Sequence, residues 1–266
     1  MLADLAPLDR SALPATSWRV EAFGAVSSTN DRIKELLRAG APEGAVATAL
    51  YQSGGYGRQG RQWESPVGGL YTSFALRPAV DMRTLPTLSL AASLAVCRAI
   101  ESVAAPAGLA VKWPNDVLAR AGKLSGISLE ALAGGVCIGV GINVFSRRDV
   151  VEVPGKYRLA SLFDDEVVDD LSAAQRAIAT RLLGALLTWM DAYYRRWQDE
   201  GFAGLIGEYE RRLAFVGSSC ALETIDGTPL EAGTIRGVDA QWRLLVETPS
   251  GIVPAASGEV HVTSIG

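Results

Sequence analysis

The sequence predicts an α+β fold in two unequal parts: a mixed sheet with helices packed on one face, and a small C-terminal β-barrel. Short runs rich in Val, Ile and Leu alternate with helical patterns over residues 18–145, and one long amphipathic pattern follows. From Phe215, glycine-rich turns separate β-like runs of about 6–8 residues. We therefore expect one domain over residues 1–214 and a second over residues 215–266.

Periodicity predicts two helices in the first part. In Thr29–Arg38 the apolar side chains recur on one side, and Ser28 or Thr29 is available as the N-cap. Leu88–Val103 begins after Pro86 and is rich in Ala and Leu. These helices are expected to cover the sheet.

Five runs around these helices have the composition of strands. Each carries Val, Ile or Leu and is bounded by Gly, Pro or Asn residues, which punctuate strands. The predicted strands are Ala45–Gln52, Leu70–Leu76, Leu109–Lys112, Gly126–Leu132 and Val136–Val144.

The longest helical pattern is Leu171–Trp197, where apolar side chains recur every three or four residues. Asp170 is the expected N-cap, and Gly201 follows the expected end. We interpret the aromatic residues of this helix as core packing rather than as part of a ligand site. Glu208–Leu213 is predicted to form one more short helix.

The composition is that of a globular protein. Of 266 residues, 48% are apolar and 20% are charged, and 25 Lys and Arg against 29 Asp and Glu give a net charge of −4. This balance argues against disorder and against a dedicated nucleic-acid-binding protein. No apolar run approaches the ~18–20 residues of a membrane helix, and Met1–Arg19 lacks the features of a signal peptide. A cytoplasmic protein is expected.

The few cysteine and histidine residues limit the possible chemistry. Cys97, Cys137 and Cys220 are widely spaced and fit no metal-ligand pattern, so we expect reduced, buried thiols. His261 is the single histidine and lies close to the end of the sequence. A Ser–His–Asp triad and a histidine-based zinc site are therefore not expected.

The first motif that carries chemistry is the segment Gln52–Trp63. Gly55, Gly57 and Gly60 formally match the dinucleotide-binding pattern Gly-x-Gly-x-x-Gly, which requires a helix to follow. The following residues, Trp63–Gly69, contain proline and two glycines and disfavour a helix. No Walker A pattern occurs in the chain.

Two interpretations of this segment remain open. A mobile surface loop would carry Arg58 and Arg61 for solubility alone. Glycines interleaved with arginines are also what a loop needs to surround phosphate or carboxylate oxygens with N–H groups and guanidinium forks.

The second motif is Lys112–Gly126. The chain has four lysines beside 21 arginines, and two of the four lie here, where a compact ammonium is chemically distinct from a planar fork. Lys112 and Lys123 could equally be surface charges at strand ends. The Asn115–Asp116 pair after Pro114 is typical of a turn, and that role alone could account for it.

Two further motifs are shorter. Gly139–Asn143 places glycines inside a strand-like run, which indicates either a close approach of backbone or ligand, or a bulge and tight packing. Ser27–Asn30 stands at a predicted helix start, where N-capping is the simplest explanation.

Together these motifs resemble the biotin protein ligase (biotin–[acetyl-CoA-carboxylase] ligase) family, in order, over about residues 20–145. The β-rich tail is similar in size and place. The resemblance implies a class II synthetase-like catalytic domain followed by an SH3-like barrel. Because the motif at Ser28 begins so early, we expect the monofunctional type, without the winged-helix DNA-binding domain of many members.

The resemblance also implies roles for residues of all four motifs. Ser28-Thr29-Asn30 looks like the segment that contacts biotin, and Gly55–Arg61 like the glycine–arginine adenylate loop. Lys112–Asp116 with Lys123 is similar to the signature and catalytic lysine, and Gly139–Asn143 to the Gly-x-Gly-x-Asn strand. One position departs from the pattern: Tyr56 replaces the first arginine of the loop.

The implied reaction has two steps. Biotin attacks the α-phosphate of Mg-ATP to give biotinoyl-5'-AMP, and a lysine of an acceptor protein then takes the biotin. Lys123 would bridge carboxylate and phosphate, while Arg58 and Arg61 would hold phosphates. Asp116 would help to hold Mg²⁺ through water. No residue is assigned as a direct metal ligand.

The expected catalytic residues are Lys123 and Arg58. Ser28, Thr29 and Gln52 would bind the ureido ring, Trp113, Gly126 and Ile127 would form a pocket wall, and Asn115 and Asn143 would orient the nucleotide. The full expected ligand-binding set is Ser28, Thr29, Asn30, Gln52, Gly55, Tyr56, Gly57, Arg58, Arg61, Trp113, Asn115, Lys123, Gly126, Ile127, Gly139, Gly141 and Asn143.

The expected partner is a biotin carboxyl carrier protein or domain, with no DNA or membrane partner, and the protein is expected to be a monomer or homodimer. Two alternative functions remain. One is a lipoate or octanoate transferase of the same superfamily, and the other is a biotin-sensing regulator, against which the acidic net charge argues.

Overall fold

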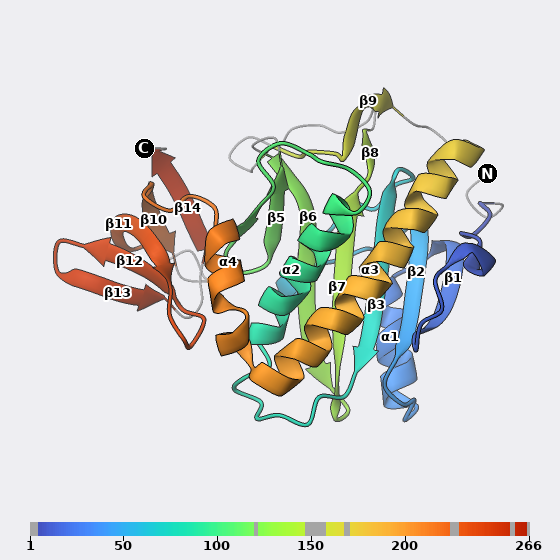
Figure 1. The fold of residues 1–266 in the computed structure, drawn as a ribbon, viewed down its shortest axis with the longest axis horizontal. Helices are drawn as coiled ribbons and strands as arrows, with labels where there is room; N and C mark the ends of the chain where they lie inside the picture. Colours follow the sequence, from blue (N-terminus) through green and yellow to red (C-terminus); the bar gives the residue numbers. More distant parts are fainter. Residues whose placement is uncertain are drawn as a thin grey trace.

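A seven-stranded mixed sheet forms the centre of the larger part of the molecule (Figure 1). The computed structural model describes residues 5–119, 122–146, 158–167, 171–223, 229–255 and 259–264. The strand order is β1-β2-β3-β7-β6-β5-β4, with β1 and β2 parallel and the other pairs antiparallel. The strands are β1 (Arg19–Val26), β2 (Ala45–Gln52), β3 (Gly69–Leu76), β4 (Ala110–Lys112), β5 (Asp116–Ala119), β6 (Gly122–Leu132) and β7 (Gly135–Asn143). The predicted mixed sheet is confirmed.

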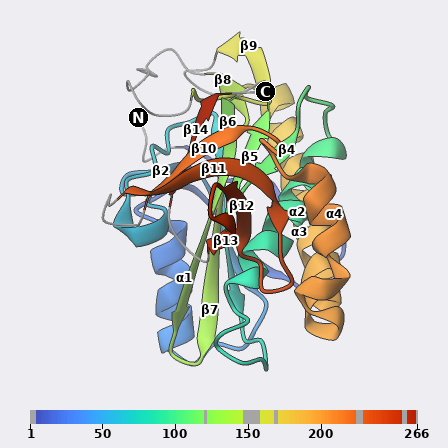
Figure 2. The same cartoon turned by 90° about the vertical axis from the view of Figure 1, so that its left-hand side faces the viewer.

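Helices cover both faces of this sheet, which corrects the expectation of one covered face. α1 (Thr29–Arg38) packs on one side, and α2 (Thr87–Glu101) and α3 (Ala173–Glu200) pack together on the other (Figure 2). The alternation of side chains along a strand explains the two cores. In β2, Val46 joins the α2–α3 core, whereas Ala47 faces α1.

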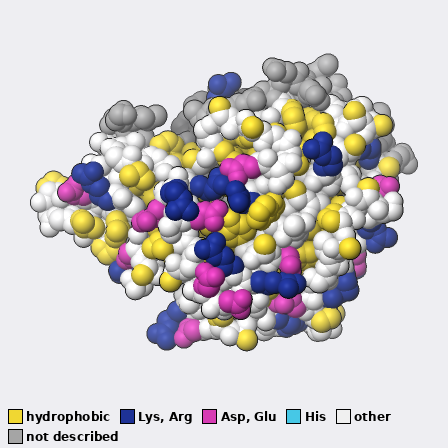
Figure 3. Space-filling view, in the orientation of Figure 1, with side chains coloured by type: hydrophobic (Ala, Val, Ile, Leu, Met, Phe, Trp, Pro, Cys, Tyr) yellow, Lys and Arg dark blue, Asp and Glu magenta, His cyan; other side chains and the backbone are white. Residues whose placement is uncertain are grey.

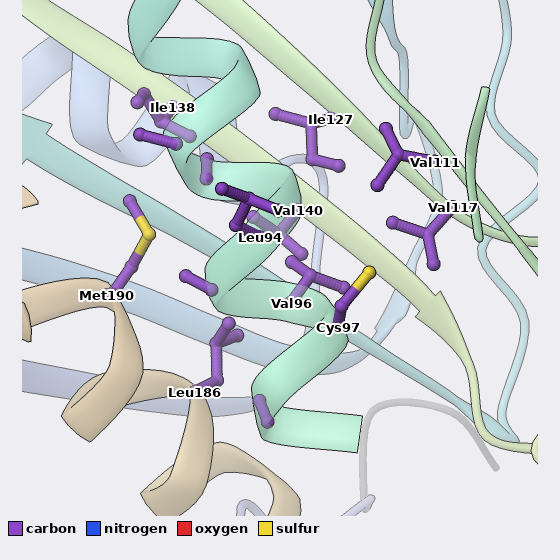
Figure 4. Close-up of a cluster of buried hydrophobic side chains, with 14 of the residues drawn as sticks. Leu94, Val96, Cys97, Val111, Val117, Ile127, Ile138, Val140, Leu186 and Met190 are labelled. Atoms are coloured by element: carbon purple, nitrogen blue, oxygen red, sulfur yellow. The ribbon is translucent and has the colours of Figure 1, made fainter. Parts of the chain in front are cut away.

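The α2–α3 core is the larger of the two. Figure 4 shows Leu94 of α2 and Leu186 of α3 with Ile138 and Val140 of β7, and all four side chains are buried. Cys97 of α2 lies in the same core, and burial raises the pKa of its thiol to about 12. Cys137 and Cys220 are also buried, and none of the three forms a disulfide, as expected.

The long helix α3 begins two residues later than predicted. Its N-cap is Ser172, whose Oγ accepts from Gln175 N while the Gln175 side chain accepts from Ser172 N. This reciprocal capping box satisfies two backbone donors, so Asp170, which lies outside the described residues, is not the cap. Gly201 ends the helix as predicted.

Short elements complete the first part. They are the 3-10 turns η2 (Arg10–Ala12), η3 (Arg58–Gly60) and η4 (Phe202–Gly204), the helix α4 (Ile206–Arg212), and the strand pair β8 (Phe145–Ser146) and β9 (Phe163–Val167). Basic and acidic side chains alternate on the face shown in Figure 3. Arg212 of α4 pairs with Glu101 of α2 at 2.8 Å. Among the described residues, no helix is both long and apolar enough to cross a bilayer.

The C-terminal strands form a separate antiparallel sheet in the order β13-β12-β11-β10-β14. They are β10 (Ser219–Glu223), β11 (Pro229–Val238), β12 (Leu244–Thr248), β13 (Gly251–Ala255) and β14 (Glu259–Ser264). The sheet fits an SH3-like domain. In the described part of the chain β13 and β14 do not pair, so the sheet is open and the expected closed barrel is corrected.

Two tryptophans join the sheets. The Trp113 and Trp242 rings stack with their centroids 6.1 Å apart, and Trp113 Nε1 donates to the Trp242 carbonyl at 2.9 Å. Nearby, Ala214 N donates to the Val111 carbonyl at 2.8 Å. The segment after β4 is therefore held from the C-terminal side.

Candidate functional site

Residues of three predicted motifs meet on the α1 face of the sheet. The amino end of α1 packs against β7, where two glycines leave room for neighbouring side chains. A Cβ at Gly139 would lie 2.7 Å from Ser128 Oγ and closer still to Asn30 Oδ1. A Cβ at Gly141 would lie 2.6 Å from Trp63 Nε1. Glycine is required here because neighbouring side chains already occupy the space of a Cβ.

A network of neutral polar side chains lines this region. Thr29 N and Oγ1 donate to Gln52 Oε1 at 2.8 and 3.0 Å. Ser73 Oγ lies 2.7 Å from Asn30 Oδ1, and Asn30 Nδ2 donates to Ser128 Oγ at 3.3 Å. All five side chains are buried, and none is ionisable. Such a network suits an uncharged polar ligand, and the sequence did not indicate its two serines.

Ser28 caps α1, and its predicted contact with a ligand stays a prediction. Its Oγ accepts from Asp31 N at 3.4 Å, which makes it the N-cap of α1. The side chain is buried beside Thr29. Ser28 therefore orients the amino end of the helix, the simpler of the two roles considered for it.

The glycine–arginine segment folds into a hairpin. Trp63 N donates to the Gly55 carbonyl at 3.0 Å and Gly57 N to the Arg61 carbonyl at 2.8 Å, with Tyr56 bridging to Gln62. No helix follows the glycines, so a dinucleotide-binding turn is excluded. A hollow of about 470 Å³ opens along the hairpin, lined by Gln52–Tyr56, Gly60 and Gln62–Pro66 among others.

The base of the hairpin depends on Gly55. A Cβ there would lie 2.8 Å from Gln52 Nε2 and closer still to Ser65 Oγ. Gln52 Nε2 donates to Ser65 Oγ at 2.8 Å, and that hydroxyl donates to the Trp63 carbonyl at 2.9 Å. Gln52 therefore connects the polar network around Thr29 to the hairpin.

Trp63 was missed by the sequence analysis. Its indole covers Gly126 and Gly141, because a Cβ on either glycine would lie within 3 Å of the ring. Trp63 Nε1 is buried and has no hydrogen-bond partner among the described residues. Lys123 Nζ lies 5.2 Å from the ring centroid, and a Cβ at Gly126 would also lie 3.3 Å from Lys123 Cε, so the indole, the glycine and the lysine lie together.

Lys123 is held in place by both its side chain and its backbone. Its Nζ lies 2.8 Å from Asp116 Oδ2 in a half-buried ion pair. Lys123 N donates to the Arg158 carbonyl at 2.7 Å, and Ala160 N donates to the Lys123 carbonyl at 3.0 Å. The pairing of β5 with β6 shifts register beside Lys123, so that Lys123 and Gly126 both face Trp63.

Arg58 reaches the same place from the hairpin. Its Nη1 donates to Asn115 Oδ1 at 2.6 Å, while Asn115 Nδ2 donates to the Ile127 carbonyl at 2.8 Å. Arg58, Asn115, Asp116 and Lys123 thus form one polar cluster. Arg61 is exposed at the hairpin tip, where its Nη2 donates to Gln59 Oε1 at 3.3 Å.

Three predicted ligand-binding side chains make their contacts within the fold. Ile127 points into the α2–α3 core, because it alternates with Gly126 along β6 (Figure 4). Trp113 stacks on Trp242, and its predicted place in the wall of the ligand pocket stays a prediction. Asn143 Nδ2 donates to the Lys123 and Ala160 carbonyls at 3.2 Å each, so it holds the backbone beside Lys123, and its predicted contact with the nucleotide stays a prediction.

Gly139→Ala is expected to weaken ligand binding and to destabilise the protein by about 1–3 kcal/mol, because the new methyl group would displace Asn30 and Ser128. Thermal unfolding measures the loss of stability, and titration with the ligand measures the loss of binding. Gly207→Ala is the matched control, since its Cβ would meet nothing closer than Arg211 Nη1 at 3.7 Å on the exposed side of α4. Equal stability of the two variants would contradict the close approach at Gly139.

The comparisons with known proteins agree with one another. The sequence model of the biotin/lipoate A/B protein ligase family matches residues 23–144. The chain is 32% identical to the biotin–[acetyl-CoA-carboxylase] ligase of Mycobacterium tuberculosis, over 96% of this chain and 95% of that protein. It is 32% identical to the bifunctional ligase/repressor BirA of Bacillus spizizenii, over 89% of this chain and 72% of that protein.

A solved structure matches at a similar level. The biotin protein ligase from Aquifex aeolicus in complex with biotin and ATP has a TM-score of 0.74 and 28% sequence identity. The match covers 91% of this chain and 97% of that one. The fold, including the C-terminal sheet, is therefore shared with that protein.

Proposed function

This chain belongs to the biotin/lipoate A/B protein ligase family, and we propose that the cluster around Lys123 and the polar network around Gln52 form its catalytic site. The protein is an ATP-dependent biotin–protein ligase. It activates biotin as biotinoyl-5'-AMP and transfers the biotin to a lysine of an acceptor protein.

One observation carries the assignment of the site. A buried, uncharged network lies beside a cluster with two cations, Lys123 and Arg58. Biotin has the matching division, because its ureido group is neutral and polar while its carboxylate reacts next to a polyphosphate. We assign the ureido group to Thr29, Gln52 and Asn30, which offer both donors and acceptors.

In the first step, a carboxylate oxygen of biotin attacks the α-phosphorus of ATP. The bond to the β-phosphate oxygen breaks, and pyrophosphate leaves. Lys123 brings the ammonium that offsets the repulsion between carboxylate and phosphate, and Asp116 orients that ammonium at 2.8 Å. Arg58 supplies a second charge-assisted donor from the hairpin.

In the second step, the amine of an acceptor lysine attacks the carbonyl carbon of the anhydride, and AMP leaves. We propose a biotin carboxyl carrier protein or domain as the acceptor. A monomer or homodimer in the cytoplasm, acting without DNA, stays our expectation.

Mg²⁺ is proposed to enter as Mg-ATP, that is, as part of the substrate. In the described part of the chain, no three His, Cys, Asp or Glu side chains form a group that could hold a metal ion. The Asp116 carboxylate pairs with Lys123, and one carboxylate plus phosphate oxygens and waters is a common Mg²⁺ environment. Asp116 thus fits a supporting role toward a nucleotide-bound ion.

Biotin-dependent exchange of pyrophosphate into ATP tests the proposal. Exchange should require biotin, and octanoate or lipoate should not replace it, because an alkyl chain leaves the buried donors and acceptors around Gln52 unpaired. Exchange with octanoate but not with biotin would favour the lipoate or octanoate transferase alternative.

We propose residues 1–214 and 215–266 as the two domains, since β10–β14 form a sheet of their own. A chain ending at residue 214 should fold and bind biotin but use ATP poorly, because it loses the Trp242 contact that holds the segment between Trp113 and Asp116. Circular dichroism and biotin titration measure folding and binding. An insoluble product without biotin binding would show that the interface is obligate.

A further inference from the structure

Tyr56 departs from the family pattern of the loop, and its side chain leaves the hairpin to reach α1. Its hydroxyl donates to Asp31 Oδ1 at 2.6 Å. Its carbonyl oxygen accepts from Asn30 Nδ2 at 3.4 Å. Tyr56 is thus fastened to the first turn of α1 by both side chain and backbone.

Charged groups surround the Tyr56 ring. Lys34 Nζ lies 4.8 Å from the ring centroid and pairs with Glu130 at 3.2 Å and with Asp31 at 3.4 Å. Burial and the hydrogen bond to Asp31 raise the pKa of Tyr56 to about 12. The hydroxyl therefore stays protonated at neutral pH and always has a proton to donate to the carboxylate.

The two sides of the hairpin differ in how they are held. The first side, Gly55–Gly57, is pinned to α1 through Tyr56, whereas Gln59–Gln62 at the tip are exposed. Arg58 is two residues beyond Tyr56, and its Nη1 lies 2.6 Å from Asn115 Oδ1. The reach of Arg58 is consequently limited by the anchor at Tyr56.

We propose that Tyr56 is a positioning residue, held by Asp31, that keeps Arg58 over the reacting phosphate and slows the release of the acyl-adenylate. This role rests on the proposed function. The physical reason is that an anchored hairpin loses less conformational freedom when it orders over a ligand than an unanchored one. Without the anchor at Tyr56, the contacts of Arg58 alone would have to order the hairpin over the ligand.

The test compares Tyr56→Phe, Asp31→Asn and the double variant. Labelled biotinoyl-AMP is formed on the enzyme and chased with unlabelled biotin and ATP, which measures its release. Loss of one hydrogen bond to a charged group should speed release about tenfold. The double variant should release about as fast as Tyr56→Phe, because both changes act on the same Tyr56–Asp31 hydrogen bond. The rate of biotin transfer to the acceptor protein should fall by a smaller factor than the factor by which the release rate of biotinoyl-AMP rises.

Tyr193→Phe is the matched control, since the Tyr193 hydroxyl on α3 also donates to a carboxylate, Glu208 Oε1 at 2.6 Å, on the opposite side of the sheet from α1, and its release rate should match that of the parent chain. Trypsin cleavage after Arg58 and Arg61 gives a readout that needs no substrate. It should be several-fold faster in Tyr56→Phe and Asp31→Asn than in Tyr193→Phe.

Unchanged release in Tyr56→Phe and Asp31→Asn, with normal exchange in the parent chain, would overturn the role of Tyr56 alone. Additive effects in the double variant would show that Tyr56 does not act through Asp31. A lower melting temperature with unchanged release would show that Tyr56 contributes to stability and not to retention of the adenylate. A parent chain without biotin-dependent exchange would overturn the proposed function, and faster trypsin cleavage would then support only the anchor.

Discussion

Replacing Lys123 by alanine is expected to lower biotin-dependent pyrophosphate exchange by about 10²–10³-fold, the usual effect of removing one donor aimed at developing charge. The ammonium lies 2.8 Å from Asp116 and is fixed by backbone bonds on both sides of Lys123, so little reorganisation is needed before it acts. Biotin binding should persist, because the buried network around Gln52 is untouched.

Lys123→Arg keeps the positive charge but changes the shape of the cation, so it tests whether shape matters as well as charge. A guanidinium is planar and larger than an ammonium, so it should pair with Asp116 but fit poorly between the Trp63 ring and two substrates. We expect most of the exchange to be lost in this variant as well. Exchange is measured with saturating biotin and ATP, beside biotin titration of each variant. Near-normal exchange in Lys123→Ala would remove Lys123 from the catalytic role.

Arg58→Gly is expected to release biotinoyl-AMP about ten- to hundredfold faster, which corresponds to the loss of about 1.5–3 kcal/mol from one charge-assisted hydrogen bond. Lys123 would still bridge the reacting oxygens, so the adenylate should form and then escape. The escaped anhydride would biotinylate unrelated proteins at their surface lysines.

The measurement is labelling of a bystander protein at equal biotin and ATP by the parent chain, Arg58→Gly and Arg61→Gly. Arg61 is the matched control because it carries the same charge but lies exposed at the hairpin tip. We expect Arg61→Gly to label less than Arg58→Gly. Negligible labelling by Arg58→Gly, with adenylate still formed, would remove Arg58 from the retention role.

The parts of the fold with strong local signals could be predicted from the sequence. α1 and β2 match the predicted Thr29–Arg38 and Ala45–Gln52 residue for residue, since one has a capping serine and the other a run of Ala, Val and Leu. β1 was missed because Arg19–Val26 is a half-buried edge strand whose partner is set by tertiary pairing. Local composition does not contain that pairing.

The candidate site was predicted as a set of motifs rather than as faces of strands. Gly126 and Ile127 both belong to the predicted wall, yet alternation along β6 sends only Gly126 toward Trp63. The register shift beside Lys123 depends on how β5 pairs, which no local pattern encodes. Ser73 could have been noticed, because a serine inside the apolar run Leu70–Leu76 is a buried polar group that needs a partner.

The glycines at 126, 139 and 141 make the floor of the site out of backbone, and this restricts how the enzyme can evolve. Most sites change substrate by trading one lining side chain for another, but here even a methyl group collides with Trp63, Asn30 or Ser128. New acids can therefore be accommodated only by changes above the floor, on the first turn of α1 and on the hairpin. Libraries for an altered acyl group should randomise those positions and leave the glycines intact.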